Sequence, residues 1–375
     1  MLNLKNNKFK KIGILGTLFL FCITSFLNNS FFANASAQSV LNIGKGGTNA
    51  NSLESAKYNL GQTNTISSSS TDNQFPSSKA VYDYINNALN KKILIVGGAA
   101  GQNGKMAISD EQNTWDSSFE PFPTTDIWHS AAHGKNKFVA INVENKIIYS
   151  TTGEEGTWLE ASSDSIPSPG WRGLTYGDEK FVAVGVSGKI AYSNDGITWT
   201  YAGQFGNVFE KVAYGGGKFI AVGQKNIYYS SDGITWTKAT YQEPTGTGLY
   251  GIAYGNGKFV AVGQTGETAY STDGITWVLS VSGTIYMRAV VWGKDKFVAV
   301  GSAGNIKISY DGITWEEPFS VGSNQFNNII WTGTQFIAIG LSGSITHSNT
   351  GLADSWASPT ALTNTTWFGI AMSTT

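Results

Sequence analysis

The chain has 375 residues and a formal net charge of −1, and only 14% of its residues are charged. Because no run of Lys or Arg follows the first eleven residues, nucleic-acid binding through a basic face is excluded. The 45 glycines and an aromatic share of 13% are typical of a turn-rich globular protein and not of a disordered one.

Residues 1–37 have the three parts of a secretory signal peptide. Four lysines among the first eleven residues form its positive region, 12–27 are apolar, and Ala35-Ser36-Ala37 is a small-residue cleavage site. The alternative is an uncleaved anchor, but the apolar stretch is shorter than the roughly 20 residues that a spanning helix needs. The sequence therefore predicts an extracellular protein, secreted or on the cell surface, with no membrane span after cleavage.

Residues 38–91 are rich in Asn, Ser and Thr and form a predicted stalk or linker. Within them, "GKGGTNANSLESAKYNLG" (44–61) and "FPSSKAVYDYINNAL" (75–89) resemble elements of phage tail-fibre proteins. The resemblance implies an attachment stalk that assembles as an oligomer, often a trimer. Phage fibres need no signal peptide, so the combination favours a cellular protein built from fibre-like parts.

From the residues alone, 78–89 is a predicted helix, because its apolar residues recur at i, i+1, i+4 and i+5. Two interpretations stay open for it. The helix either links to or packs against the next domain, or it self-associates, although it is short for a coiled coil.

Residues 92–375 contain a repeat with a period of about 40 residues, which is the length of a four-stranded propeller blade. Two marker residues carry it. The Phe of "KFVAV" and its variants falls at Phe138, Phe181, Phe219, Phe259, Phe297 and Phe336. A closing Trp falls at Trp115, Trp158, Trp199, Trp236, Trp277, Trp315 and Trp356.

One repeat divides into four predicted strands, A to D. They are "LYGIAYG" (249–255), "KFVAVG" (258–263), "ETAYS" (267–271) and "TWVLS" (276–280). Strand B is almost continuously apolar, as expected of a strand buried on both faces. Asp273-Gly274 predicts a tight hairpin turn between C and D, in which glycine adopts a positive φ.

Seven closing tryptophans predict seven blades, but the first repeat lacks its strand A. "KILIVGG" (92–98) begins directly at strand B, whereas "WFGIAMS" (367–373) is a strand A with no repeat after it. The last strand is therefore expected to complete the first blade and close the ring. The sequence predicts an all-β, seven-bladed propeller, since a sandwich or a β-helix would not explain these complementary halves.

Four repeats share the sequence Asp-Gly-Ile-Thr-Trp, which resembles the Asp-box of sialidase-like propellers, with one residue fewer between Asp and Gly. The resemblance implies a structural hairpin at the periphery, away from any active site. The carboxylates are expected to accept backbone N–H bonds across the turn, and the Trp to pack between blades. The structural turns are Asp195-Gly196, Asp232-Gly233, Asp273-Gly274 and Asp311-Gly312.

Sialidase activity is disfavoured, because that family binds its acidic sugar through three arginines. This chain has two, Arg172 and Arg288. Similar repeats also occur in photosystem assembly factors of the Asp-box type, whose arginine-rich patch two arginines cannot supply, so that resemblance implies a relative in fold only. Glu154, Glu155, Glu316 and Glu317 lie in polar turns and are predicted to be solvated.

The sequence predicts no metal site and no cofactor. His129 and His133 are four residues apart on a predicted strand, roughly 13 Å, which is too far for one ion. His347 stands alone, and no glycine-rich stretch opens a helix that could hold phosphate. The only cysteine, Cys22, lies in the signal segment, so the mature chain would have no disulfide and no thiol nucleophile.

The candidate ligand site is the second position of the seven A strands. The position before it stays large and apolar and is predicted core: Trp128, Trp171, Phe209, Leu249, Met287, Phe326 and Trp367. The second position varies freely and is expected to ring the mouth of the channel: His129, Arg172, Glu210, Tyr250, Arg288, Asn327 and Phe368. Such a mixed rim suits a polar ligand or a peptide, and the alternative is a hydrated rim without a ligand.

These features together predict a non-enzymatic recognition or adhesion protein. Its expected partner is a glycan or a cell-surface protein, bound at the loop-rich end of the channel, where variable loops usually determine specificity. Assembly into a homo-oligomer through the stalk is expected. The alternatives are a glycoside hydrolase or lyase with an unusual site, and a structural scaffold between proteins.

Overall fold

A computed structural model describes residues 91–373, apart from 100, 111–114, 116, 123–124, 126, 164–165, 168–169, 242–247 and 282. Residues 89–375 form one compact unit. The predicted signal peptide (1–37) lies outside the described residues. So do residues 38–90 of the predicted stalk, which include the helix predicted at 78–89.

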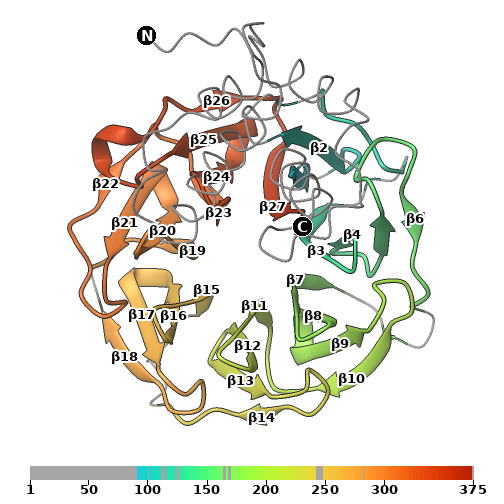
Figure 1. Ribbon diagram of the computed structural model, residues 1–375, viewed down its shortest axis with the longest axis horizontal. Coiled ribbons are helices and arrows are strands. Elements are labelled where there is room, and N and C mark those ends of the chain that lie inside the picture. The colour runs from blue at the N-terminus through green and yellow to red at the C-terminus, as the bar shows by residue number, and fades with distance from the viewer. Residues whose placement is uncertain are drawn as a thin grey trace, which may run out of the picture. The chain divides into compact units, whose positions relative to one another are not determined.

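Seven antiparallel sheets follow one another around a central axis, with one strand of each sheet facing inward (Figure 1). This is the predicted all-β propeller of seven blades. In blades two to seven, four strands follow one another from the inside outward. Blade two is β3–β6 (Trp128–Gly134, Lys137–Asn142, Ile147–Ser150, Leu159–Glu160), and blade three is β7–β10 (Trp171–Gly177, Lys180–Gly185, Lys189–Ser193, Thr200–Gln204). Blade four is β11–β14 (Phe209–Gly215, Lys218–Gly223, Asn226–Ser230, Thr237–Lys238), and blade five is β15–β18 (Leu249–Gly255, Lys258–Gly263, Glu267–Ser271, Val278–Val281). Blade six is β19–β22 (Met287–Gly293, Lys296–Gly301, Asn305–Ser309, Phe319–Ser320), and blade seven is β23–β26 (Phe326–Trp331, Phe336–Gly340, Ser344–Ser348, Thr360–Ala361).

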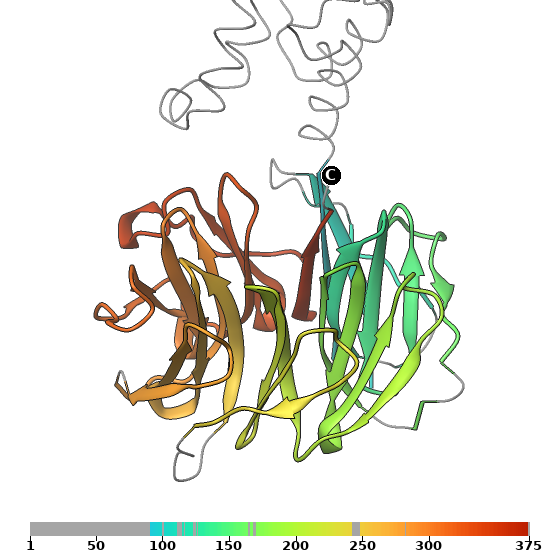
Figure 2. The same cartoon turned by 60° about the horizontal axis from the view of Figure 1, so that its bottom comes forward.

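Blade one joins the two ends of the propeller sequence, as predicted. Its inner strand is β27 (Thr366–Met372), which pairs antiparallel with β1 (Lys92–Gly98), followed by β2 (Lys105–Asp110). Figure 2 shows the red β27 beside the blue-green β1. Two isolated bridges, Met106 to Phe119 and Ser109 to Trp115, replace a fourth strand.

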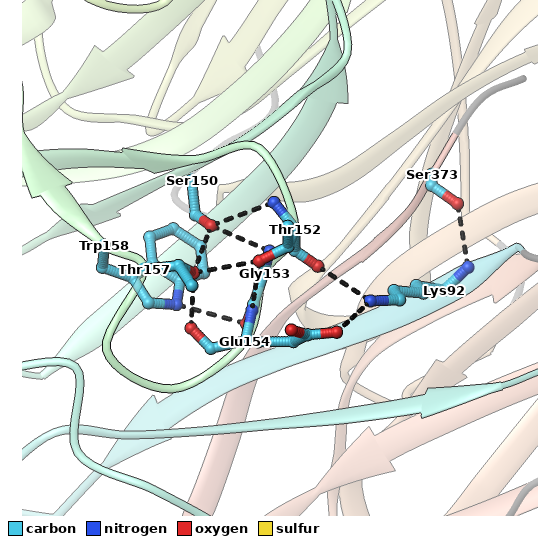
Figure 3. A network of polar contacts seen from close by, with 8 residues as sticks. All are labelled: Lys92, Ser150, Thr152, Gly153, Glu154, Thr157, Trp158 and Ser373. Atoms are coloured by element: carbon cyan, nitrogen blue, oxygen red, sulfur yellow. Dashed lines mark hydrogen bonds and ion pairs between the residues drawn. The ribbon is translucent and has the colours of Figure 1, made fainter.

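Polar contacts of Lys92 reinforce this closure (Figure 3). Its backbone N–H donates to Ser373 Oγ at 2.8 Å, just beyond β27. Its Nζ lies 2.5 Å from Glu154 Oε1 in the outer turn of blade two. Lys92 therefore connects the C-terminal strand, blade one and blade two. Glu154 is exposed, as predicted, and this solvated carboxylate also has a cationic partner.

Blades three to seven each present an aromatic ring to the preceding blade, where it packs against a glycine at the end of the inner strand. Tyr254 lies against Phe259 of its own blade, with ring centroids 4.8 Å apart, and against Gly215 at the end of the preceding inner strand. A Cβ at Gly215 would lie 2.2 Å from Tyr254 Cγ. The same arrangement recurs for Gly255 with Trp292. A side chain at these strand ends would therefore push neighbouring blades apart.

The turns only partly follow the prediction. Strands A, B and C of blade five begin and end where predicted, but strand D begins at Val278, two residues late. Tyr270 pairs with Val278, so the turn around Asp273 is longer than a two-residue hairpin. Two-residue turns lie instead between A and B. Asn256 and Gly257 have φ values of 47° and 73°, as a type I′ turn requires.

The longer turn has the hydrogen bonds that the sequence predicts, plus a serine that sequence reasoning missed. Asp273 Oδ1 accepts the backbone N–H groups of Ile275 and Thr276, both at 2.8 Å. Ser271 Oγ accepts the N–H of Gly274 at 2.8 Å, and Trp277 Nε1 donates to the Gly274 carbonyl at 3.2 Å. The N–H of Thr276, then that of Ile275, hold the pKa of Asp273 below its usual value.

Blades two and seven build the same turn without an aspartate. In blade two, Ser150 Oγ accepts the Gly153 N–H at 2.8 Å, and Thr152 Oγ1 accepts the Glu154 N–H at 3.3 Å (Figure 3). Blade seven repeats this with Ser348 and Thr350. The serine is therefore the common element of the turn, and the aspartate is one of two solutions beside it.

Replacing Ser271 by Ala is expected to destabilise the protein by about 1–2 kcal/mol, because the buried Gly274 N–H loses its acceptor. The measurement is the urea midpoint of unfolding. Thr272→Ala, at an exposed neighbouring position, is the matched control and should leave the midpoint unchanged. Equal midpoints for both variants would show that the serine contributes nothing to the turn.

Candidate functional site

Two sets of connections meet at one end of the ring. The segment before each inner strand bonds to the turn that follows strand B, as in Gln264 N–H to the Gly248 carbonyl at 3.2 Å and Leu341 N–H to the Gln325 carbonyl at 3.0 Å. The Asp-Gly turns lie at the other end, where Lys258 Nζ donates to the Asp311 carbonyl at 2.8 Å. The loop-rich end was predicted to be the binding end.

All seven candidate residues occupy the same structural position, a β-bulge in the inner strand. In blade five, Leu249 pairs with Gly263 and Gly251 pairs with Val262, so Tyr250 has no partner in the ladder. A bulge re-aims the extra side chain away from the sheet. The bulged residues are His129, Arg172, Glu210, Tyr250, Arg288, Asn327 and Phe368.

Six of these side chains line one small cavity on the axis. They are His129, Glu210, Tyr250, Arg288, Asn327 and Phe368, and Lys211 joins them. The free space between them is about 20 Å³. That volume holds about one water molecule and is too small for a sugar ring. Arg172 does not line the cavity, but it contacts a residue that does.

Lys211 is the site residue that sequence reasoning missed. It follows the bulge, at a position that is small in most blades: Ser130, Gly173, Gly251, Ala289 and Gly369, with Asn328 in blade seven. Small residues suit this position because a Cβ at Gly251 would lie 2.7 Å from Ala289 Cα of the next inner strand. A lysine in a column of small residues is the signal that could have identified it.

His129 and Arg172 form a pair between blades two and three. His129 Nδ1 lies 2.9 Å from the Arg172 carbonyl oxygen, and Arg172 Nη1 lies 3.2 Å from His129 Nε2. Burial, followed by the positive charge of Arg172, lowers the pKa of His129 to about 3. The imidazole is therefore neutral at physiological pH, so it can donate through Nδ1 and accept at Nε2. The Phe368 ring stacks on it at 5.2 Å.

Arg288 lies among aromatic rings. Its guanidinium carbon is 4.9 Å from the Tyr286 ring centroid and 6.0 Å from that of Tyr250. The two tyrosine rings meet edge to face at 5.0 Å. Burial raises the pKa of Tyr286, so its hydroxyl stays protonated. Arg288 Nε is buried and forms no hydrogen bond within the described residues.

Both amide atoms of the Asn327 side chain form hydrogen bonds within the protein. Its Nδ2 donates to the Trp367 carbonyl at 2.9 Å, and its Oδ1 accepts from Gln325 Nε2 at 2.8 Å. The residue is 5% exposed. Asn327 therefore shapes the cavity wall and has little capacity left for a ligand.

The charges around the cavity do not balance. Arg172, Lys211 and Arg288 are cationic, and Glu210 is the one carboxylate among the ring residues. The ion pairs found in the described part of the chain include none of these three cations. Burial, with a smaller contribution from Arg288, lowers the pKa of Lys211 to about 8, although Glu210 opposes the shift.

A second pocket, of about 320 Å³, lies at the periphery between blades five and six. It is lined by Gly283–Ile285, Lys307 and Trp315–Pro318. The outer strand of blade six changes register here. The bond from Glu316 N–H to the Ile308 carbonyl sets a register in which Pro318 would lie opposite Ile306, but Ile306 pairs with Phe319. The outer strand therefore bulges at the proline. Trp315 Nε1 forms no hydrogen bond in the described structure, unlike Trp277 Nε1.

The remaining candidates do not form a site. His129 and His133 lie on β3 as predicted, and His133 packs edge-on against Phe138 with ring centroids 4.7 Å apart. Burial lowers the pKa of His133 to about 4. The described residues contain no group of three His, Cys, Asp or Glu side chains that could hold a metal ion. No helix in the described ranges has the length and apolar character to span a bilayer.

Comparison with solved structures supports the fold. YCF48 bound to a D1 peptide is 15% identical with a TM-score of 0.51, and the match covers 63% of this chain and 82% of that one. YCF48 from Cyanidioschyzon merolae is 13% identical with a TM-score of 0.51, covering 66% and 88%. The computationally designed protein Ika8 is 13% identical with a TM-score of 0.52, covering 73% and 92%.

No known protein family and no curated protein sequence matches the chain. The resemblances to the Asp-box and to phage tail fibres therefore stay predictions, although the turn geometry at the aspartates is present.

Proposed function

We propose that this protein recognises a segment of another protein at the loop-rich end of its channel. The observation that carries the proposal is the ring of bulged residues. The seven blades share a backbone, but the bulged side chain at the axis varies from blade to blade, and six of these side chains meet at one cavity. Aromatic and arginine side chains such as Tyr250 and Arg288 are the types that dominate binding energy at protein interfaces.

The similarity to YCF48 supports the same proposal. That propeller was solved with a D1 peptide bound, so this architecture can serve as a protein-binding scaffold. Glu210 is the single carboxylate in the cavity lining and does not make the pair that glycoside hydrolases use, so we propose binding without catalysis at this cavity.

Glycan binding is a second candidate function, and the peripheral pocket suits a glycan better than the axial cavity does. Its volume of about 320 Å³ is within the range of ligand sites. Trp315 offers an apolar surface, and Glu316 and Glu317 offer hydrogen-bond acceptors for hydroxyl groups. A glycan ligand would therefore bind at the outer edge of blades five and six.

We further propose that the chain is secreted or surface-displayed and assembles through its stalk. Two measurements check this. The secreted protein should begin at Gln38 on N-terminal sequencing, and light scattering should give an oligomer for residues 38–375. An uncleaved N-terminus would contradict removal of the signal peptide, and a monomer would contradict assembly through the stalk.

The function is tested by panning the mature chain against a peptide display library and a glycan array. Tyr250→Ala/Arg288→Ala is expected to weaken the selected peptides at least about tenfold, because both side chains flank the cavity. Lys180→Ala, beside the A-to-B turn at the opposite end, is the control and should bind like wild type.

Peptides that bind the double variant as tightly as wild type would refute recognition at the ring. Glycans that bind wild type and the double variant equally would support the peripheral pocket as a separate site. The melting temperatures of both variants show whether either substitution disturbs the fold.

A further inference from the structure

We propose that the axial cavity binds a carboxylate, carried by the protein segment that the ring recognises. The inference rests on the proposed function and specifies the chemical group that enters the channel. Two cations, Lys211 and Arg288, line this small space, and a third, Arg172, bonds to His129 in its wall.

The three cations come from neighbouring and separated blades but act on the same place. Each of them contributes to the low pKa of His129, which lines the cavity. Arg172 also bonds to that imidazole directly at 3.2 Å. Glu210 is the one carboxylate in the cavity lining, against Lys211 and Arg288 in the lining and Arg172 beside it, so positive charge is in excess when Lys211 is protonated. Such an excess in a partly desolvated channel attracts an anion.

An unused hydrogen-bond donor in the cavity wall points to the same kind of ligand. Arg288 lines the cavity, and its Nε atom is buried and has no acceptor in the described structure. A buried donor without a partner costs free energy, which an incoming acceptor would recover. Charged nitrogen donors bind carboxylate oxygens more strongly than neutral acceptors.

The size of the cavity limits what can enter. About 20 Å³ of free space admits one small group and not a sugar ring or an aromatic side chain. The smallest anionic group that a protein segment offers is a carboxylate, either at a C-terminus or on an Asp or Glu side chain, and one of its oxygens would take the space that a water molecule fills. The rest of the segment would contact Tyr250 and Phe368, which also line the cavity.

Lys211 makes the binding pH-dependent. Its pKa of about 8 is lowered by burial and by Arg288 and raised by Glu210. A bound anion favours the charged ammonium, so affinity should be highest below pH 8 and fall above it. Two neighbouring groups keep one protonation state in this window: burial holds the pKa of His129 at about 3, so the imidazole is neutral, and burial raises the pKa of Tyr286, so its hydroxyl stays protonated.

The test uses the full mature chain and a peptide selected by display. The peptide is made in its native form, with its C-terminus amidated, and with its acidic side chains changed to Asn or Gln. One neutral form should bind at least about tenfold more weakly, and its identity shows which carboxylate enters. Sodium acetate at constant ionic strength is the second probe, and should raise the melting temperature more than sodium chloride does.

Variants of the chain complete the design. Lys211→Met should weaken the native peptide about tenfold and abolish the decline in affinity above pH 8, whereas Lys180→Met should do neither. Glu210→Gln should strengthen binding, which a merely structural role of the ring would not produce. Circular dichroism confirms that each variant is folded.

The outcomes separate this inference from the proposed function. If all peptide forms bind wild type equally, the ring recognises a segment but the carboxylate proposal is wrong. If acetate stabilises the protein while no library peptide binds, the anion site stands and recognition of a protein segment is wrong. If neither probe has an effect, both are overturned.

Discussion

Deleting residues 366–375 is expected to abolish cooperative unfolding of the propeller. This removes β27, whose Trp367 is fully buried, and leaves the ladder edge of β1 unpaired. Ile93 and Ile95, which are fully buried in the intact protein, would lose the strand that covers them. Since domains are stable by only about 5–15 kcal/mol, losing one whole inner strand should exceed what the ring can tolerate.

The measurement is thermal unfolding followed by near-ultraviolet circular dichroism. Deleting only residues 374–375 is the control and should leave the melting temperature unchanged. A synthetic peptide of residues 362–375, added in trans, should restore the transition, because the missing strand brings its own hydrogen bonds and apolar face. A sharp transition at the wild-type temperature in the longer deletion would show that the ring does not depend on this closure.

Replacing Gly255 by Ala is expected to destabilise the protein by about 3 kcal/mol, at the upper end for overpacking. The new Cβ would lie 2.0 Å from Trp292 Cγ, closer than any real contact. The indole cannot easily move away, because it packs against Phe297 with ring centroids 4.7 Å apart. The substitution should therefore force blades five and six apart.

Gly257→Ala is the matched control two residues away. Nothing lies within 4 Å of a Cβ there, and the cost is only that of a positive φ of 73°, about 1 kcal/mol. Urea unfolding of both variants measures the difference. If Gly257→Ala is as destabilising as Gly255→Ala, backbone strain and not the contact between blades explains the glycine at the strand end.

The blade count and ring closure could be predicted because the repeat is nearly literal. Strands A, B and C of blade five were predicted to the residue, since "KFVAVG" has the continuous apolar pattern of a strand buried on both faces. Strand D was misplaced because Thr276 and Trp277 belong to the turn. Thr276 forms a bridge to Thr240 of blade four. The sequence pattern of a single repeat cannot show this contact between blades.

Comparing the repeats predicted which seven residues surround the mouth of the channel, but not the backbone feature that places them there. Tyr250 stood out because its position varies, and the structure explains this by a bulge that removes it from the ladder. Lys211 was not predicted, because it occupies the next position of the strand, beside the variable one. Its role depends on the approach of neighbouring inner strands, as at Gly251 and Ala289, which sequence spacing along one blade does not reveal.

Hydrogen–deuterium exchange of the mature chain with and without a display-selected peptide tests the central claim most directly. Recognition at the loop-rich end predicts new protection at the starts of β15 and β19 and in the turns 264–266 and 302–304, which follow their B strands. Protection confined to the Asp-Gly turns, such as 272–276 at the opposite end, would contradict it.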